Sequence, residues 1–375
     1  MQLIIGGDLM PTQSNTVLFR NSNIIDLLGE ELLRIWNLAD IRIFNLEAPI
    51  ADKESPIDKC GPNLIIKTNN IYGVKALNPS LIALANNHIF DHGEYGLKST
   101  KRILKEFKIP FVGAGVNLDE AIIPLIFEFK ELKIGIYACA EHEFSIATES
   151  TPGANPFDPL ESLDHIQVLK VKCDYVIVLY HGGKEHYRYP SPYLQKVCRK
   201  MVNKGADVVI CQHSHCIGCY EEYGDSFIIY GQGNFIFDNS ECEYWKTGLL
   251  IKLDISNKMD IDFIPIIKKG NVIRLATGEE AQAILSDFKN RSNKILNENF
   301  IEKKYQEFSI ENIQFYLRHF SGLGKWISRF DNRLLNGMIL KKKYNKAKLL
   351  AIENFIKCES HRELVLMGLN NKGKK

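Results

Sequence analysis

Five short apolar runs in this chain each lead to a polar residue that can bind a divalent metal ion. Short runs of β-branched and aliphatic residues are typical of buried strands, and the strands of one sheet bring the residues just past their ends to a common edge. Carboxylate, amide and imidazole side chains would then meet, a mixture that suits zinc, manganese or iron. The runs at residues 3–5, 41–44, 81–85, 175–180 and 207–210 lead to Asp8, Glu47, Asn87 with His88, His181, and His213 with His215.

The composition is that of an ordinary soluble globular protein. The chain has 375 residues, of which 45% are hydrophobic and 25% charged, enough for two domains or one large one. No apolar run reaches 18 residues, and the first residues predict a strand with no basic segment before it, so we expect a cytoplasmic protein. The odd count of nine cysteines favours reduced thiols over disulfides.

One group of cysteines leaves an alternative open. Cys211, Cys216 and Cys219 have the C-x4-C-x2-C spacing of a plant-type ferredoxin loop, and Cys242 offers a fourth ligand for an iron–sulfur cluster. We favour the interpretation that these thiols are bystanders, because two histidines occupy the same loop and nothing else ferredoxin-like surrounds it.

Helix and strand signals alternate through the first two thirds of the chain and predict an α/β fold. Apolar residues at helical spacing predict helices at 22–37, 94–107, 160–169 and 192–204. Residues 122–129 and 132–138 predict a strand pair, and further strands are expected at 227–230, 248–253 and 261–267. From about residue 278, helical periodicity with lysine and arginine clusters replaces the strand signals. We therefore expect one domain over 1–270 and a basic helical extension over 271–375.

The order of the polar motifs resembles that of the CapA-like bacterial capsule and poly-γ-glutamate biosynthesis proteins. The matching residues are Gly7-Asp8, Asn45-Leu46-Glu47, Ala85-Asn86-Asn87-His88 with Asp91 and Gly93, His181-x-Gly183-x-Glu185, residues 205–210, His213-x-His215 and residues 233–238. The resemblance implies a metallophosphoesterase-like (calcineurin-like) domain, a four-layer α/β/β/α sandwich over residues 1–270, followed by a C-terminal helical extension.

The resemblance also implies a role for each polar residue. Asp8 and His215 would hold one ion, Glu47 would bridge two ions, and Asn87, His181 and His213 would hold the other. His88 would act as a general acid or transition-state donor, oriented by Asp91. Glu185 and Asn234 are candidates for substrate contact, although a solvated loop charge and a turn residue are their plainer interpretations.

The chain departs from the family pattern where a metal ligand is expected. Met10 replaces the histidine of the D-x-H motif, and a thioether is a poor ligand for zinc, manganese or magnesium. We therefore expect one tightly held divalent ion (Mn, Zn, Fe or Mg) and a second held weakly. Gly182 replaces an aromatic residue and Cys211-Gln212 replaces Gly-His, changes that alter the wall of the site and leave its ligands in place.

The C-terminal residues carry a strong basic bias. Residues 277–375 contain 19 Lys and Arg against 11 Asp and Glu, a net charge of +8, which leaves −6 for the residues before them. Lysines at 341–343, 346 and 348, followed by apolar residues at 349, 350, 352, 355 and 356, are compatible with an amphipathic helix on an anionic membrane. A helical cap with a solvated basic face is the favoured alternative, and nucleic acid is not expected as a partner.

Two functions from different classes follow. The first is metal-dependent hydrolysis, or a related transfer, during synthesis of a capsule or cell-surface polymer, with an anionic polymer or a phosphorylated or glycan intermediate as partner. Divalent ions would lower the pKa of a water from ~15.7 towards 7 and so supply hydroxide. The second is a non-catalytic, anionic-polymer-binding subunit of a polymer synthase complex. Both are compatible with a cytoplasmic protein that contacts the inner face of the membrane peripherally.

Overall fold

The computed structural model describes residues 1–238, 241–256 and 258–372. Its Cα positions divide into two compact units, Met1–Glu302 and Lys303–Lys375. The boundary predicted after residue 270 therefore falls inside the first unit. The difference arises because β15 (Val272–Leu275) pairs with β14 (Met259–Lys269), and α9 (Gly278–Lys294) packs against the same strand.

Within the described residues, the first unit contains a mixed sheet of seven strands, in which one half is parallel and the other antiparallel. In spatial order these are β15, β14, β13 (Thr247–Ile255), β1 (Gln2–Leu9), β2 (Ile41–Leu46), β3 (Leu81–Ala83) and β4 (Phe111–Val112). Strands β1 to β4 run parallel, and β13 joins β1 antiparallel. Their apolar residues follow one another without alternation because both faces of the sheet are covered.

A second sheet packs against the first. In spatial order its described strands are β11 (Tyr220–Tyr223), β12 (Ser226–Ile229), β10 (Val208–Gln212), β9 (Tyr175–His181), β7 (Leu132–Ala140) and β6 (Leu125–Phe129). Residues of β9 alternate between two cores, as the period of a strand requires. Ile177 and Leu179 join the core shared with the first sheet, whereas Val176 and Val178 pack under the helices on the outer face.

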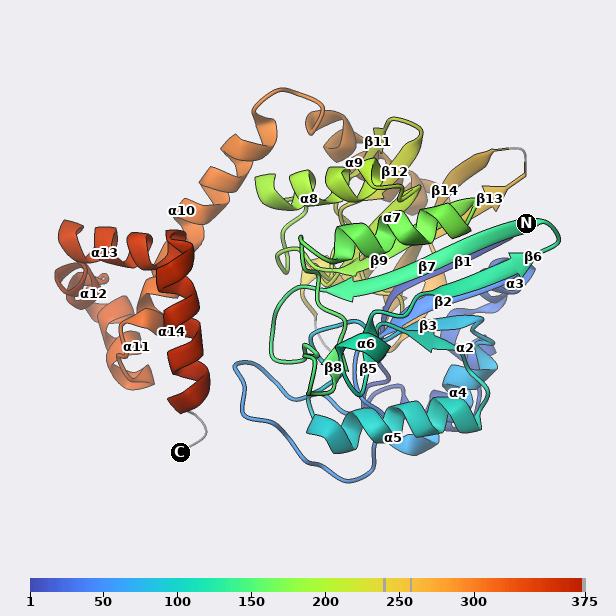
Figure 1. Ribbon diagram of the computed structural model, residues 1–375, viewed down its shortest axis with the longest axis horizontal. Coiled ribbons are helices and arrows are strands. Elements are labelled where there is room, and N and C mark those ends of the chain that lie inside the picture. Colours follow the sequence, from blue (N-terminus) through green and yellow to red (C-terminus); the bar gives the residue numbers. More distant parts are fainter. Residues whose placement is uncertain (239–240, 257, 373–375) are drawn as a thin grey trace. The chain divides into compact units, whose positions relative to one another are not determined.

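Helices cover the outer faces of both sheets, so the first unit has the predicted α/β/β/α layers (Figure 1). The described helices of this unit are α1 (Thr16–Arg20), α2 (Ile24–Leu28), α3 (Glu30–Leu38), α4 (Ile71–Ala76), α5 (Gly93–Glu106), α6 (Leu118–Ala121), α7 (Ser162–Lys172), α8 (Pro192–Asn203) and α9. In Figure 1, α4 and α5 lie on one side of the sheets, and α7 and α8 on the other.

The single helix predicted over residues 22–37 is wrong. The chain forms two helices there, α2 and α3, which meet at Gly29 with φ +76°. A residue in this left-handed conformation interrupts an α-helix, and glycine adopts it at little energetic cost. After the break, α3 packs Trp36 on the ring of Phe235 at 4.9 Å, and the Trp36 indole N–H donates to the carbonyl of Leu77 at 2.7 Å.

Short elements complete the first unit, and helices make up the second. The strands β5 (Ala114–Gly115) and β8 (Gly153–Ala154) pair with each other, and 3₁₀ turns occur at Thr68–Asn70 and Glu243–Lys246. Helix α10 (Phe300–Phe320) leads into α11 (Lys325–Leu334), α12 (Met338–Lys343), α13 (Lys346–Lys357) and α14 (Glu359–Lys372). No helix in the described residues combines the length and apolar character needed to cross a bilayer.

Candidate metal centre

The predicted ligands lie at the carboxyl ends of strands from both sheets. Asp8 is next to the last residue of β1, and Glu47 directly follows β2. His181 is the last residue of β9, and His213 directly follows β10. The expectation that one sheet would present all of these residues is therefore corrected, because β1 and β2 belong to the first sheet and β9 and β10 to the second.

The side chains form two groups that share Glu47. Glu47, His181 and His213 make one group, and Asp8, Glu47 and His215 make the other, with the potential ligand atoms of each within 4.8 Å of one another. The Glu47 Oε1 atom lies 3.5 Å from His181 Nε2 and 3.8 Å from His215 Nε2. The family resemblance implies the same division of ligands between two ions bridged by Glu47, and the binding of those ions stays a prediction.

Asn87 joins the first group through its carbonyl oxygen. Its Oδ1 atom lies 3.0 Å from His181 Nε2, and His181 Nε2 lies 3.1 Å from His213 Nδ1. The three polar atoms are thus turned towards one another. In the second group, His215 Nδ1 lies 3.5 Å from Asp8 Oδ2.

Glu47 provides the test of whether a cation fits. Its side chain is fully buried, and neither carboxylate oxygen has a hydrogen-bond partner among the described residues. Burial, and next the neighbouring Asp8, raise the pKa of Glu47 well above its usual value. Buried carboxylates without partners are rare because they lose hydration without compensation. A divalent cation between the histidines would supply that compensation, so the residues present fit one.

The buried histidines are held in their neutral form. Burial, and next the proximity of His213, lower the pKa of His181 well below its usual value, and burial lowers the pKa of His213 to about 3. Burial raises the pKa of Asp8, an effect that His215 opposes. Neutral imidazole is the metal-binding form, so these histidines would be ready for a cation across the physiological pH range.

The backbone that carries the two last histidines is strained. His213 has φ +81° and His215 has φ +52°, in the left-handed region that residues with a Cβ atom seldom occupy. Each such residue costs of order 1–3 kcal/mol. Strand β10 ends at Gln212, and the sharp turn that follows directs both rings towards Glu47.

Amide side chains fix the position of Asp8. The Asn45 Nδ2 group donates to Asp8 Oδ1 at 2.8 Å, and the Asn86 Nδ2 group donates to Asn45 Oδ1 at 3.0 Å. The backbone N–H of His88 in turn donates to Asn86 Oδ1 at 3.1 Å. These bonds connect β1, β2 and the segment after β3 in one buried chain.

The segment before Asp8 requires glycine. A Cβ atom on Gly7 would lie 2.1 Å from the backbone oxygen of Gly233. The close approach lets the backbone N–H groups of Phe235 and Ile236 donate to the Asp8 carbonyl at 2.9 and 3.1 Å. On the same segment, Asn234 Oδ1 accepts a hydrogen bond from His215 Nδ1 at 2.7 Å. Asn234 thus orients His215, and its predicted contact with substrate stays a prediction.

His88 and Asp91 form the predicted pair, and a lysine joins them. His88 Nδ1 lies 2.6 Å from Asp91 Oδ2. Lys59 forms an ion pair with Asp91 Oδ1, and its Nζ atom lies 3.2 Å from His88 Nδ1. The Lys59 side chain is only 3% exposed. The sequence analysis missed Lys59, which lies on a long irregular segment after β2 without hydrophobic periodicity.

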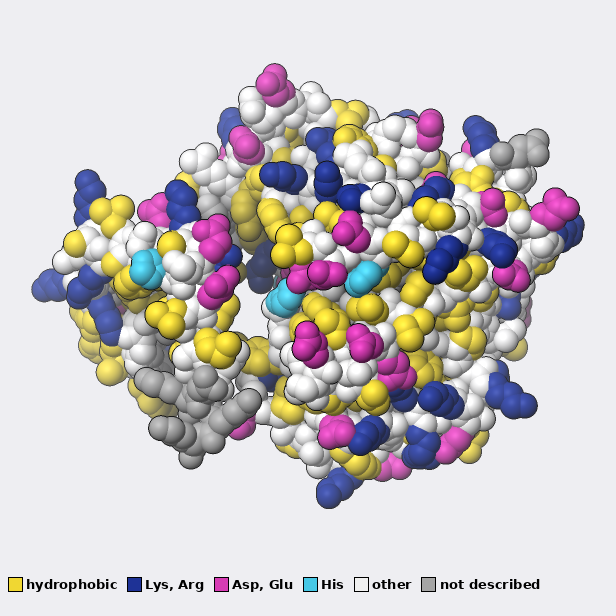
Figure 2. Space-filling view, viewed as in Figure 1, with side chains coloured by type: hydrophobic (Ala, Val, Ile, Leu, Met, Phe, Trp, Pro, Cys, Tyr) yellow, Lys and Arg dark blue, Asp and Glu magenta, His cyan; other side chains and the backbone are white. Residues whose placement is uncertain are grey.

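Two acidic residues after β7 also border the site and were missed. Glu143 Oε2 accepts a hydrogen bond from Asn87 Nδ2 at 3.3 Å, and Glu143 Oε1 lies 3.9 Å from His213 Nε2. Glu141 Oε1 accepts the backbone N–H of Gly183 at 3.0 Å. Figure 2 shows acidic and histidine side chains gathered on the surface near the carboxyl end of β7. A Glu-x-Glu pair directly after a strand was the available signal.

The remaining predicted residues have clear places. Glu185 is exposed on the loop after β9, near enough to contribute to the raised pKa of Glu47. Met10 is buried in the hydrophobic core. A Cβ atom on Gly182 would lie 2.8 Å from Glu141 Cγ, which explains the lack of a larger residue there.

Among the described residues, the groups of potential ligands contain no cysteine, so the iron–sulfur alternative gains no support.

Comparisons with known proteins agree with the motif order. A model of the family described as "Bacterial capsule synthesis protein PGA_cap" matches residues 2–239. The capsule biosynthesis protein CapA of Bacillus anthracis is 30% identical over 204 residues, 52% of this chain and 49% of that protein. The PGA biosynthesis protein CapA of Bacillus subtilis (strain 168) is 28% identical over 213 residues, 54% of this chain and 55% of that protein.

The matched part of the chain thus spans about half the length of these curated relatives. Among solved structures, a phosphatase from Mycoplasma pneumoniae gives a TM-score of 0.43 at 16% identity, covering 72% of this chain and 94% of that one. The family match spans most of the chain and takes in both sheets up to β12, together with the two groups of side chains that meet at Glu47. This chain therefore belongs to the bacterial capsule synthesis protein family.

Proposed function

We propose that this protein is a divalent-metal-dependent hydrolase that cleaves a phosphoester or related bond during synthesis of a capsule or cell-surface polymer. The observation that carries the proposal is Glu47, a fully buried carboxylate whose two oxygens have no hydrogen-bond partner among the described residues. Three neutral or hydrogen-bonded imidazoles and a second carboxylate surround it. A bound zinc, manganese or iron ion explains such a donor set better than a purely structural hydrogen-bond network does.

The ligand assignment follows the two groups. Asn87, His181 and His213 would hold one cation with Glu47, and Asp8 and His215 would hold a second with the same carboxylate. When bound, the cations supply Lewis acidity and lower the pKa of a water nucleophile. The second group has fewer protein donors because Met10 lies in the core. We therefore expect the first position to bind its cation more tightly.

The protein's own groups would provide proton transfer and orientation. Asp91 engages His88 Nδ1, so transfer of a proton to a leaving group falls to Nε2. A positioned general acid contributes about 10²- to 10⁴-fold to a rate. Lys59 fixes Asp91 from its other oxygen, and Asn234 fixes the His215 ring. Glu185, on the exposed loop after β9, is our candidate for contact with the substrate.

The test combines metal analysis with a generic substrate. Purified protein loaded with manganese, zinc or magnesium is assayed on bis(p-nitrophenyl) phosphate, beside His88→Ala and Glu47→Gln variants. We expect Glu47→Gln to lose metal and turnover together, and His88→Ala to keep its metal and lose about 10²-fold or more in kcat. Glu131→Gln, in an exposed turn, is the matched control. Loaded protein that is no faster than buffer would refute hydrolysis of this bond class.

The substrate class follows from the relatives' names. They refer to capsule and PGA biosynthesis, so we propose an anionic polymer, or a phosphorylated or glycan intermediate of one, as substrate. The alternative is a non-catalytic subunit of a polymer synthase complex that binds the polymer through the same site. That function predicts tight metal retention without turnover, and polymer binding that is lost when the metal is removed.

A further inference from the structure

Helix α11 in the second unit turns apolar side chains towards solvent. Trp326 is 81% exposed, Ile327 49%, Phe330 51% and Leu334 71%. At about 100° per residue these four positions cover an arc of about 100° on one helix face. Large contiguous apolar faces are uncommon on water-exposed surfaces and mark binding sites. We call this set of four residues the α11 apolar face.

The orientation of the helix is fixed by a buried acid. Asp331 is 1% exposed, and its carboxylate oxygens accept the backbone N–H groups of Ile339 and Leu340, at 2.8 and 3.2 Å. These bonds satisfy the first N–H groups of α12, and Leu340 is itself buried. Asp331 thus faces its own unit while the four apolar residues face solvent. Rotation of the helix to bury the apolar face would break both bonds.

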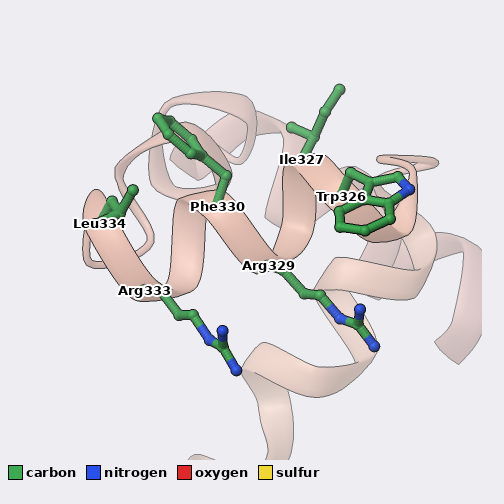
Figure 3. A pocket seen from close by; sticks show the side chains of 6 residues that line it. All are labelled: Trp326, Ile327, Arg329, Phe330, Arg333 and Leu334. Atoms are coloured by element: carbon green, nitrogen blue, oxygen red, sulfur yellow. The ribbon is translucent and has the colours of Figure 1, made fainter.

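Cations border the α11 apolar face. Arg329 and Arg333, one turn apart, lie beside it, and the Arg329 guanidinium lies 5.8 Å from the centre of the Trp326 ring. Figure 3 shows the two arginines extending from one side of α11, and Ile327, Phe330 and Leu334 from the other. Together with Trp326, these side chains line a groove of about 630 Å³.

The whole second unit shares this basic character. By sequence, residues 303–375 contain 16 Lys and Arg against 6 Asp and Glu, a net charge of +10, whereas the first unit has −8. Lys341 and Lys342, which follow on α12, are exposed. Figure 2 shows hydrophobic, basic and acidic side chains on the visible face of this unit, and the net charge comes from the sequence count. The charge therefore favours an anionic partner.

We infer that the α11 apolar face docks on an anionic lipid membrane. Tryptophan with other large apolar residues on one face, bordered by arginine and lysine, is the pattern of a helix that lies in the plane of a membrane interface. The arginines would bind lipid phosphates in bidentate fashion while the apolar face enters the acyl boundary. A soluble polyanion would engage the cations and leave the four apolar side chains in water. This inference is independent of the proposed hydrolysis.

The test is co-sedimentation of the full chain with vesicles. One set contains phosphatidylcholine alone and the other contains phosphatidylcholine with phosphatidylglycerol at 7:3, both at low salt. We expect binding to the anionic vesicles to be at least about tenfold stronger. Trp326→Ser with Phe330→Ser should weaken this binding about tenfold or more, and Arg329→Gln with Arg333→Gln should reduce it to the level on neutral vesicles.

Matched controls come from exposed residues of the first unit. Val168→Ser with Val171→Ser on α7, and Lys196→Gln with Lys200→Gln on α8, should leave binding unchanged. A Trp326→Phe variant should keep its binding but lose the blue shift of emission that vesicles induce in the unmodified protein. That readout depends on the local environment of one ring, so a folding defect cannot imitate it.

Four results would overturn the inference. Equal binding to neutral and anionic vesicles is one, and undiminished binding by the double serine variant is another. A concentration-dependent dimer that Phe330→Ser disperses would assign the face to a second copy of the chain. Binding of soluble polyglutamate that the double serine variant retains, without vesicle binding, would assign the cations to a polymer.

Discussion

Replacing Glu47 by glutamine should stabilise the metal-free protein while abolishing metal binding. The carboxylate is fully buried and its oxygens have no hydrogen-bond partner among the described residues, so its ionised form carries an uncompensated desolvation penalty. For a polar group left unsatisfied the penalty is about 1–3 kcal/mol, and it is larger for a charge. Glutamine has the same shape without the charge. We therefore expect a gain of about 2 kcal/mol, which raises the melting midpoint of a unit of this size by roughly 3 °C, at an unfolding entropy of ~2.1 cal/mol/K per residue.

The effect of Glu47→Gln on the stability of the metal-free protein depends on pH. Because the pKa of Glu47 is raised above its unfolded value, the protonated form favours folding, and this contribution is lost as pH rises through the folded pKa. The gain from Glu47→Gln should thus be present at pH 8 and fade at acid pH. Excess manganese or zinc should make the wild type more stable than Glu47→Gln, since a ligand at 100 times its Kd stabilises the wild type by about 2.7 kcal/mol.

Differential scanning calorimetry with and without EDTA measures both effects. Glu131→Gln, at an exposed position, should show neither the gain nor the loss of metal response. If metal-free Glu47→Gln melts below metal-free wild type, and its response to metal is intact, then Glu47 is not an unsatisfied carboxylate that awaits a cation.

Three further predictions concern neighbouring residues. Because burial lowers the pKa of His213 from 6.5 to about 3, metal-free protein should lose stability as pH falls from about 6.5 towards 3, and His213→Gln should flatten that slope in thermal melts. Lys59→Met, which removes the cation from Asp91, should lower kcat roughly 10- to 100-fold at unchanged metal content, with partial recovery in Lys59→Arg. Gly7→Ala, whose Cβ would meet the Gly233 oxygen, should cost about 3 kcal/mol in urea unfolding.

Local patterns predicted individual elements well and their assembly less well. The strand pair of β6 and β7 and the helix α8 lie where the sequence places them, because alternation and helical spacing are local signals. The break at Gly29 was missed, since one glycine inside an apolar stripe only lowers helix propensity. The pairing of β15 with β14 places residues after 270 in the first unit. This pairing depends on tertiary contacts, and the four residues of β15 are too few to predict it from sequence.

In the candidate site, too, residues with a local sequence signal were predicted and residues without one were missed. Asp8, Glu47, His181 and His213 were predicted because each comes after a readable apolar run, and the structure brings these four side chains together. Lys59 lies on an irregular segment that folds back towards His88. Two groups of this segment, the Lys59 ammonium and the Leu64 backbone N–H, donate hydrogen bonds to the Asp91 carboxylate. Such a contact has no periodicity, and a single sequence offers no other signal for it.

Three unfavourable features coincide at this one place in an otherwise well-packed fold. The Glu47 carboxylate has no hydrogen-bond partner among the described residues, His181 is buried beside it, and His213 and His215 occupy left-handed conformations. A cluster that served only stability could be replaced by apolar residues of similar volume, often without loss. Structural rules that fail together at one place are therefore expected at functional sites, where a ligand offsets the strain. The opposite signs expected for Glu47→Gln with and without metal test this reasoning directly, because a merely structural carboxylate would show the same sign in both.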